Sequence, residues 1–407
     1  MMIKRSGGYR MNFIFISPNF PKTYWNFCRG LMRNGVRVLG IGDAPYEQLQ
    51  ENLKQNLTEY YKVGSLENED EVYRACAYFA FRYGRIDWIE SNNEYWLMKD
   101  AALRTDFNVT SGVRNEEIAF IKMKSRMKEM YATAGVPTAR WHTVSTLQQS
   151  LDFVAQVGWP VVVKPDNGVG ANATWKLENE EQLRRFFQAL PPVPYIMEEY
   201  IPGTIESYDG IAGRQRQIIF ETTHVFPRPI MEIVNHQEDI YYYSRRQIPQ
   251  DLREMGRRVV ATFPTQSRFF HCEFFRLNED KPGLGKRGDL VGLEVNMRPP
   301  GGYTPDMMNY ANDIDVYQIW ANMIAFGRGD FDPDQRPYFC VYAGRRDGLN
   351  YRCSLDEVVH RWHEAIVMKE RMPEVLAGAM GNEMLTARFS DEAEMMRFVD
   401  DALGKAE

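Results

Sequence analysis

Short apolar runs alternate with longer amphipathic segments through the first hundred residues, and this alternation limits the fold more than any other feature. The runs at 12–16, 36–41 and 86–90 have the length and composition of buried strands. Segments of helical length lie between them, as at 68–83. Buried strands that alternate with helices are typical of a parallel sheet covered by helices. We therefore predict a small Rossmann-like α/β domain over residues 11–113.

Two helices of this predicted domain have recognisable ends or faces. Pro21 opens one segment and Gly35 follows its end, which matches a helix with proline in its first turn and glycine just past its last. The helix at 68–83 should pack against the sheet through an apolar side. That side is expected to consist of Val72, Cys76, Phe79 and Phe81.

The rest of the chain mixes helices with strands that need no crossover helix. A helix rich in Lys and Met is followed by Gly135-Val136-Pro137, where glycine ends the helix and proline prevents a restart. Strands at 159–164 and 195–200 around a helix at 179–189 predict an α+β lid. Strands at 270–277 and 290–296, with a helix at 250–263, predict an antiparallel sheet. After a linker at 331–335, a small α+β module is expected, with strands at 338–344, 365–371 and 383–389.

Composition excludes several classes of protein. The 407 residues are 44% apolar, which is ordinary for a globular protein, and no apolar run is long enough for a membrane span. The formal charge of −6 leaves no general basic surface, so nucleic acid is not an expected partner. The opening residues lack the apolar core of a signal peptide, and we expect a cytoplasmic protein. Five scattered cysteines suggest neither a disulfide framework nor a zinc site.

Lys164 ends an apolar strand and is followed by the glycine-containing loop 165–172. A lysine at a strand end can pair with a nucleotide phosphate while the loop's backbone N–H groups approach the phosphate oxygens. The segment 196–203 then offers extended backbone to an adenine edge, with Glu206 close by as a carboxylate for ribose hydroxyls. Taken singly, a solvated lysine beside a turn and an ordinary strand explain these segments as well.

Two acidic strands supply candidate metal ligands. Alternation places Glu294, Asn296 and Arg298 on one face of their strand, and Glu273 lies on another strand nearby. Mg²⁺ prefers a few hard oxygen ligands together with water and substrate phosphates. A solvated polar sheet face is the alternative, but Pro299-Pro300-Gly301-Gly302 then forms a tight loop suited to close approach by a ligand.

In this order and spacing, the elements resemble the ATP-grasp superfamily over about residues 11–330, with a weaker echo in the tail. The resemblance implies a pre-ATP-grasp Rossmann-like domain (11–113), an ATP-grasp domain (114–330, lid at about 136–200) and a C-terminal α+β module (336–407). It implies ATP contacts from Lys124, Lys164, Gly168, Gly170, Glu198, Glu199, Tyr200, Ile201 and Glu206, magnesium ligation by Glu273, Glu294 and Asn296, and phosphoryl stabilisation by Arg298 and Lys164. Met123 departs from the family, where many members carry Asp before the lysine.

The resemblance also implies an activity. A carboxylate–amine ligase would use ATP and Mg²⁺ to convert a small carboxylate into an acyl phosphate, which an amine then attacks. Whether Mn²⁺ can replace Mg²⁺ and whether the chain forms a homodimer stay open. For substrate contacts we select Arg228, Arg298, Gly301 and Gly302, although solvated arginines and strand propensity explain the region around Arg228 and 236–246 equally well.

Two other activities fit the same resemblance. A carboxylase-like or carbamoyl-phosphate-synthase-like enzyme would phosphorylate bicarbonate in place of an organic acid. A non-catalytic protein would only bind nucleotide for regulation. The latter would be expected to lose its metal ligands first, whereas Glu273, Glu294 and Asn296 are all present.

Overall fold

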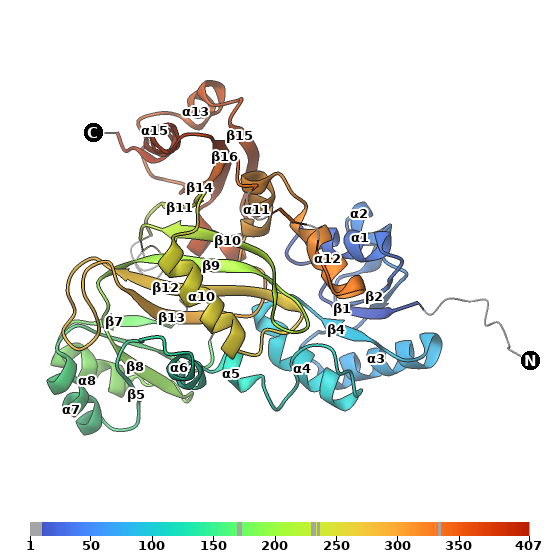
Figure 1. The fold of residues 1–407 in the computed structure, drawn as a ribbon, viewed down its shortest axis with the longest axis horizontal. Coiled ribbons are helices and arrows are strands. Elements are labelled where there is room, and N and C mark those ends of the chain that lie inside the picture. Colours follow the sequence, from blue (N-terminus) through green and yellow to red (C-terminus); the bar gives the residue numbers. More distant parts are fainter. Residues whose placement is uncertain are drawn as a thin grey trace, which may run out of the picture.

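The computed structural model describes residues 10–168, 173–228, 233, 237–329, 331–332 and 335–406. Within these residues the strands form three sheets, one of them parallel and two antiparallel, with helices packed on them (Figure 1). The predicted combination of α/β and α+β architecture is therefore confirmed. Among the described residues, no helix has the length and apolar character needed to cross a bilayer.

The parallel sheet is formed by the first hundred residues. Its order is β3-β2-β1-β4, with β1 (Asn12–Ile16), β2 (Arg37–Gly42), β3 (Glu59–Lys62) and β4 (Trp88–Glu90). The helices of this region are α1 (Trp25–Arg33), α2 (Glu51–Lys54), α3 (Glu69–Tyr83) and α4 (Leu97–Asp106). Every residue of β1 is buried, as expected for a central strand covered on both faces.

Helix α3 corrects one prediction about its buried side. Its N-cap is Asn68, whose side chain accepts a hydrogen bond from the Glu71 N–H, and Val72, Cys76 and Phe79 are fully buried. Phe81, however, is 92% exposed. Two residues rotate the helix by about 200°, so Phe81 and Phe79 must point in opposite directions.

The lid is a small antiparallel sheet with two helices, drawn in green in Figure 1. Its strand order is β5-β8-β6-β7, made of β5 (Trp141–Thr143), β6 (Val161–Pro165), β7 (Trp175–Leu177) and β8 (Tyr195–Glu199). Helices α7 (Leu147–Val157) and α8 (Glu180–Gln188) pack against it. Their N-caps, Thr146 and Asn179, accept hydrogen bonds from the backbone three residues on, which defines where each helix begins.

The central sheet has eight strands in the order β13-β12-β9-β10-β11-β14-β16-β15. Its first five strands are β9 (Gly203–Ala212), β10 (Ile218–Phe226), β11 (Ile240–Ser244), β12 (Arg268–Leu277) and β13 (Leu290–Asn296). Its helices include α10 (Gln250–Thr262), α11 (Thr304–Asn312) and α12 (Val316–Phe326), and the short α5 (Ala119–Lys122) and α6 (Lys124–Thr133) precede the lid.

The C-terminal strands continue this sheet. β14 (Phe339–Arg345) pairs antiparallel with β11, and β16 (Glu383–Phe389) and β15 (Ile366–Arg371) extend the sheet beyond it. Helices α13 (Leu355–Arg361), α14 (Glu374–Met380) and α15 (Glu392–Leu403) belong to the same segment. The residues expected to form a small tail module thus share one hydrogen-bonded sheet with the predicted antiparallel half.

The parallel and central sheets also share a hydrophobic core, which contains Phe13 of β1 and Phe269 of β12. Helices α1 and α12 meet within it, where Phe27 contacts the rings of Tyr317 and Trp320 with centroids 4.7 and 4.9 Å away. At Gly30 a Cβ atom would lie 2.9 Å from the Cβ of Ala321, so only glycine permits this approach. Arg268 of β12 also pairs with Glu90 at 3.0 Å, and this ion pair holds the carboxyl end of β4 close to the central sheet.

Candidate active site

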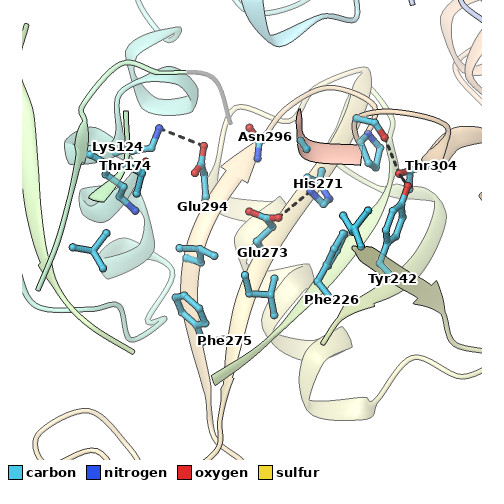
Figure 2. A pocket seen from close by; sticks show the side chains of 18 of the residues that line it. Lys124, Thr174, Phe226, Tyr242, His271, Glu273, Phe275, Glu294, Asn296 and Thr304 are labelled. Atoms are coloured by element: carbon cyan, nitrogen blue, oxygen red, sulfur yellow. Dashed lines mark hydrogen bonds and ion pairs between the residues drawn. The ribbon is translucent and has the colours of Figure 1, made fainter. Parts of the chain in front are cut away.

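A cavity of about 420 Å³ lies between the lid and strands β12 and β13 of the central sheet (Figure 2). Most residues selected from the sequence line it. They are Lys124, Lys164, Glu198, Glu199, Tyr200, Ile201, Glu273, Glu294, Asn296, Arg298, Gly301 and Gly302. These residues come from five separate segments of the chain, so the fold brings them together over long sequence distances.

The predicted glycine loop is only partly described. Gly170 lies outside the described residues, whereas the carbonyl of Gly168 accepts a hydrogen bond from Lys124 Nζ at 3.4 Å. Asp166 joins the loop to the start of α6, because its carboxylate accepts hydrogen bonds from the backbone N–H and the hydroxyl of Ser125 at 2.7 and 2.8 Å. This clamp orients Lys124 at the first position of α6 toward the cavity.

Glu206 is not among the residues that line the cavity, contrary to its predicted place at a ribose. Its carboxylate is buried and paired with Arg245 at 3.0 Å and Arg276 at 2.9 Å. Its neighbour Ile205 lines the cavity instead. Successive residues of a strand point to opposite faces, so only one of the two can face the nucleotide side.

Arg228 also lies outside the cavity. Its side chain is 60% exposed and paired with Glu238 at 2.5 Å. Of the other cations expected near a carboxylate substrate, Arg245 and Arg246 line a separate hollow beside the start of α10. The side-chain cations that line the cavity, among the described residues, are instead Lys124, Lys164, His271 and Arg298.

Glu198 of β8 is held between two buried lysines. Its carboxylate lies 2.6 Å from Lys128 Nζ and 2.7 Å from Lys164 Nζ. Burial raises the pKa of Glu198, but the two lysines outweigh this effect and the pKa falls to about 2. Burial lowers the pKa of Lys128, while Glu198 and Glu294 together outweigh burial and raise the pKa of Lys164. Lys164 is therefore a stable cation at the cavity wall.

The neighbouring Glu199 serves the lid through its side chain. Its carboxylate accepts hydrogen bonds from the Arg140 backbone N–H at 2.8 Å and from the Arg140 guanidinium at 2.6 Å. These bonds tie the end of β8 to the segment before β5. Glu199 and the next two residues, Tyr200 and Ile201, all line the cavity.

The acidic strands meet at a β-bulge. Glu273 of β12 stands directly opposite Glu294 of β13, but Phe274 stands opposite Gly292, so β13 contains one extra residue at Leu293. A bulge re-aims side chains locally. It allows the adjacent residues Leu293 and Glu294 both to line the cavity.

Like charges that face each other across two strands repel, so the opposed carboxylates need a cation. Lys124 Nζ lies 3.5 Å from Glu294, and the His271 ring lies 3.3 Å from Glu273, as Figure 2 shows. Asn296 stands opposite His271 two pairs further along the strands, and therefore on the same face. Two carboxylates, one amide oxygen and nearby lysines thus surround one part of the cavity.

His271 is fixed by a second buried acid. Its Nδ1 is hydrogen-bonded to Asp209, which also accepts from Ser207 Oγ at 2.5 Å and pairs with the His224 ring at 2.7 Å. Burial lowers the pKa of His271, but Asp209 and Glu273 outweigh it and raise the pKa to about 9. His271 is therefore a cation at neutral pH and faces Glu273 with its other ring nitrogen.

Arg298 connects the cavity with the parallel sheet. Its Nε lies 3.2 Å from the Glu94 carboxylate, and Lys122 Nζ lies 2.8 Å from the other oxygen of that group. Glu94 follows β4, so the contact depends on the shared core of the two sheets. A buried carboxylate between two cations holds the guanidinium in place while the side chain still lines the cavity.

Comparison with known proteins supports the resemblance to ATP-grasp enzymes. Residues 123–190 match the family model described as carbamoyl-phosphate synthase L chain, ATP binding domain. The fold is similar to an L-amino acid ligase from Bacillus licheniformis, with a TM-score of 0.71, 14% sequence identity and 97% of both chains covered. The chain has the ATP-grasp fold. This ATP-grasp chain is also similar to N5-carboxyaminoimidazole synthetase from Staphylococcus aureus complexed with ADP, with a TM-score of 0.69, 14% identity, and 96% of this chain and 97% of that one covered.

A curated relative supports the same resemblance. An L-arginine-specific L-amino acid ligase of Bacillus subtilis is 21% identical over 260 residues. The alignment covers 60% of this chain and 59% of the length of that ligase. The relatives and structural neighbours are ligases that form C–N bonds, which agrees with the predicted class of enzyme.

The ATP-grasp cavity fits a magnesium–nucleotide complex better than a metal ion alone. Among the described residues, no three His, Cys, Asp or Glu side chains are grouped as a metal site. Glu273, Glu294 and Asn296 instead offer a few hard oxygens, which suits Mg²⁺ when phosphate oxygens and water complete its coordination. The opposed carboxylates, which Lys124 and His271 contact, are the observation that favours a bound cation.

Sequence reasoning missed three parts of this ATP-grasp site. Lys128 was visible only as a lysine four residues after Lys124, and its contact with Glu198 joins two distant segments. His271 stands two residues before Glu273 on β12, and strand alternation could have placed both on one face. The apolar residues of β10, β11 and α14 that line the cavity show only ordinary hydrophobic periodicity in the sequence, which does not distinguish a cavity wall from a core.

Proposed function

We propose that this chain is an ATP-dependent carboxylate–amine ligase. A substrate carboxylate oxygen attacks the γ-phosphorus of ATP, the bond to the β-phosphate oxygen breaks, and ADP and an acyl phosphate form. An amine then attacks the acyl carbon, loses a proton, and phosphate leaves. The observation that carries the proposal is the convergence in one cavity of Lys124, Lys164, Glu273, Glu294, Asn296 and Arg298.

Each residue has a role in this proposal that follows from its charge and position. Lys164 and Lys124 pair with nucleotide phosphates, and the backbone from Glu198 to Ile201 receives the adenine edge. Glu273, Glu294 and Asn296 would hold Mg²⁺, which would supply positive charge beside the phosphate oxygens. Arg298, held by Glu94, donates hydrogen bonds to the transferred phosphoryl group or to the acyl phosphate.

The domain layout belongs to the same proposal. Residues 11–113 would form the pre-ATP-grasp domain and 114–330 the ATP-grasp domain, with the lid at about 136–200 and residues 336–407 completing the substrate end of the cavity. The lid lies over the acidic strands, so its closure would exclude water from an intermediate that hydrolyses readily.

The test is Mg²⁺-dependent release of ADP and phosphate over a panel of amino acids and small carboxylic acids, with mass spectrometry of the products. We expect turnover that needs both an acid and an amine and yields their amide. Glu294→Gln keeps the size of the side chain but removes one carboxylate, and it should reduce turnover at least a hundredfold. ADP release that no acid stimulates, from protein that binds nucleotide, would contradict the ligase proposal.

A second candidate is phosphorylation of bicarbonate. It is favoured by the match of residues 123–190 to the carbamoyl-phosphate synthase model. The apolar lining at one end of the cavity argues for the first candidate, because a bicarbonate ion has no carbon surface to bury against it. ADP release that depends on bicarbonate and needs no amine would favour the second candidate.

A further inference from the structure

The cavity has an apolar end that phosphate chemistry does not require. It is lined by Phe226 of β10, Ile240 and Tyr242 of β11, and Leu376, Ala379 and Met380 of α14. In Figure 2, Phe226 and Tyr242 lie on one side of Glu273, whereas Lys124 and Thr174 lie on the other. The acidic centre therefore separates a nucleotide side from this apolar end, which we call the side-chain chamber.

The polar atoms of the chamber already have partners. The hydroxyl of Tyr242 is hydrogen-bonded to Thr304 Oγ1 at 3.0 Å, and Thr304 Oγ1 donates to the Gly301 carbonyl at 2.8 Å. The Tyr242 ring is stacked between Phe226 and Tyr342, with both centroids 5.0 Å away. A ligand in the chamber would thus meet rigid carbon surface.

The described residues that line the chamber carry no charge. The cations of the cavity are engaged elsewhere: Lys124 and Lys164 with acids on the nucleotide side, His271 with Asp209 and Glu273, and Arg298 with Glu94. A charged side chain in the chamber would lose its hydration without gaining an ion pair, whereas an apolar one would gain from burial.

Two glycines connect the chamber with the acidic centre. At Gly302, whose φ of +63° favours glycine, a Cβ atom would lie 2.6 Å from the end of the Met380 side chain of α14. At Gly301 a Cβ atom would meet nothing within 4 Å, which leaves room beside the backbone. A carboxylate that reaches Arg298 can therefore extend its side chain past Gly301 toward Phe226 and Tyr242.

We propose that the carboxylate substrate is an acid with a bulky hydrophobic side chain, such as an aromatic or branched aliphatic α-amino acid, and that the side-chain chamber selects it. This inference rests on the proposed ligase function. It departs from the arginine specificity that names the Bacillus subtilis relative, because the described chamber residues offer no carboxylate to a guanidinium.

The test uses pairs of amino acids with ATP and Mg²⁺, and tandem mass spectrometry of the dipeptide reveals which residue donated its carboxylate. We expect kcat/KM for phenylalanine or leucine as acid to exceed that for arginine or glutamate at least tenfold. Ala379→Phe fills the chamber and should raise KM for phenylalanine at least tenfold while KM for ATP changes less than twofold. Ala393→Phe, on the exposed face of α15, is the matched control and should change neither.

A second variant tests the same inference in case Ala379→Phe does not fold. Leu376→Ala removes apolar contact and should raise KM for phenylalanine severalfold, again without affecting ATP. Preferred use of arginine, glutamate or glycine as the acid would overturn the inference and leave the ligase function intact. Unchanged KM for phenylalanine in both variants would also overturn it. If no acid stimulates ADP release, the ligase function fails and the inference fails with it.

Discussion

Replacing Glu198 with glutamine would leave two buried lysines without the acid between them. The Glu198 carboxylate is 6% exposed and within 2.7 Å of both Lys128 and Lys164. Glutamine keeps the shape of the side chain and can accept hydrogen bonds, but it carries no charge. The substitution therefore removes charge with little change in packing, and its effect on unfolding should be electrostatic.

The size of the effect follows from the pKa of Glu198. The two lysines outweigh burial and move it from the ordinary value of 4.5 to about 2. A shift of this size corresponds to about 3 kcal/mol of free energy of unfolding. Breaking a buried pair by removing one partner costs a similar amount, about 3–5 kcal/mol. We thus expect Glu198→Gln to lower the free energy of unfolding by about 3 kcal/mol.

The assay is denaturant unfolding without nucleotide at several pH values. Because the folded-state pKa is lowered, the contribution is complete above about pH 4.5 and is lost as the pH falls toward 2. The difference in free energy of unfolding between parent and variant should stay constant from pH 8 to pH 5 and become smaller below pH 4.5. Glu180→Gln removes an exposed acid paired with Arg184 and should cost less than about 0.5 kcal/mol. If Glu198→Gln lowers the free energy of unfolding by as little as the control does, the two lysines do not stabilise the fold through this carboxylate.

Two further predictions concern buried groups away from the cavity. Burial raises the pKa of Asp306 to about 7, so the folded state binds this proton more tightly than the unfolded state does. The free energy of unfolding should therefore fall as the pH rises from about 4 to about 7, by up to about 4 kcal/mol. Asp306→Asn can still accept the hydrogen bond from Tyr317, and it should abolish this pH-dependent loss of stability. Denaturant midpoints of parent and variant at pH 5 and pH 8 test this. If the variant loses as much stability as the parent, other groups cause the loss. Gly256→Ala should lower the free energy of unfolding by about 1–3 kcal/mol although alanine favours helices, because its Cβ would lie 2.2 Å from the ring of Tyr208. Tyr208 is held by Glu221 and stacked on Phe270, so a higher thermal midpoint for the variant would show that the ring can shift.

Much of the fold could be predicted because local patterns dominate it. The strand at 290–296 has the predicted bounds, since a period-two pattern ends at the turn-forming Pro299-Pro300. The helix at 69–83 also begins next to its predicted start, where Asn68 caps it. Phe81 was assigned to the wrong side because aromatic character was weighed above the angle between residues.

The site was predictable where one strand carries several of its groups and unpredictable where contacts join distant segments. Strand alternation correctly placed Glu294, Asn296 and Arg298 along one cavity. It could not reveal which face of β9 points inward, and Glu206 was selected where Ile205 lines the cavity. The Leu293 bulge is equally invisible in sequence, because it depends on how β13 pairs with β12.

The continuous sheet from β13 to β15 has a consequence for dividing or recombining this protein. A chain cut before β14 would leave β11 with unpaired N–H and C=O groups along one side, and such an exposed edge invites association with other chains. It would also lose α14, which lines the side-chain chamber. The segment from β14 to the C-terminus therefore cannot be exchanged between relatives as an independent domain. A graft intended to alter substrate choice would have to preserve the β11–β14 register from Ile240 opposite Gly344 to Ser244 opposite Cys340.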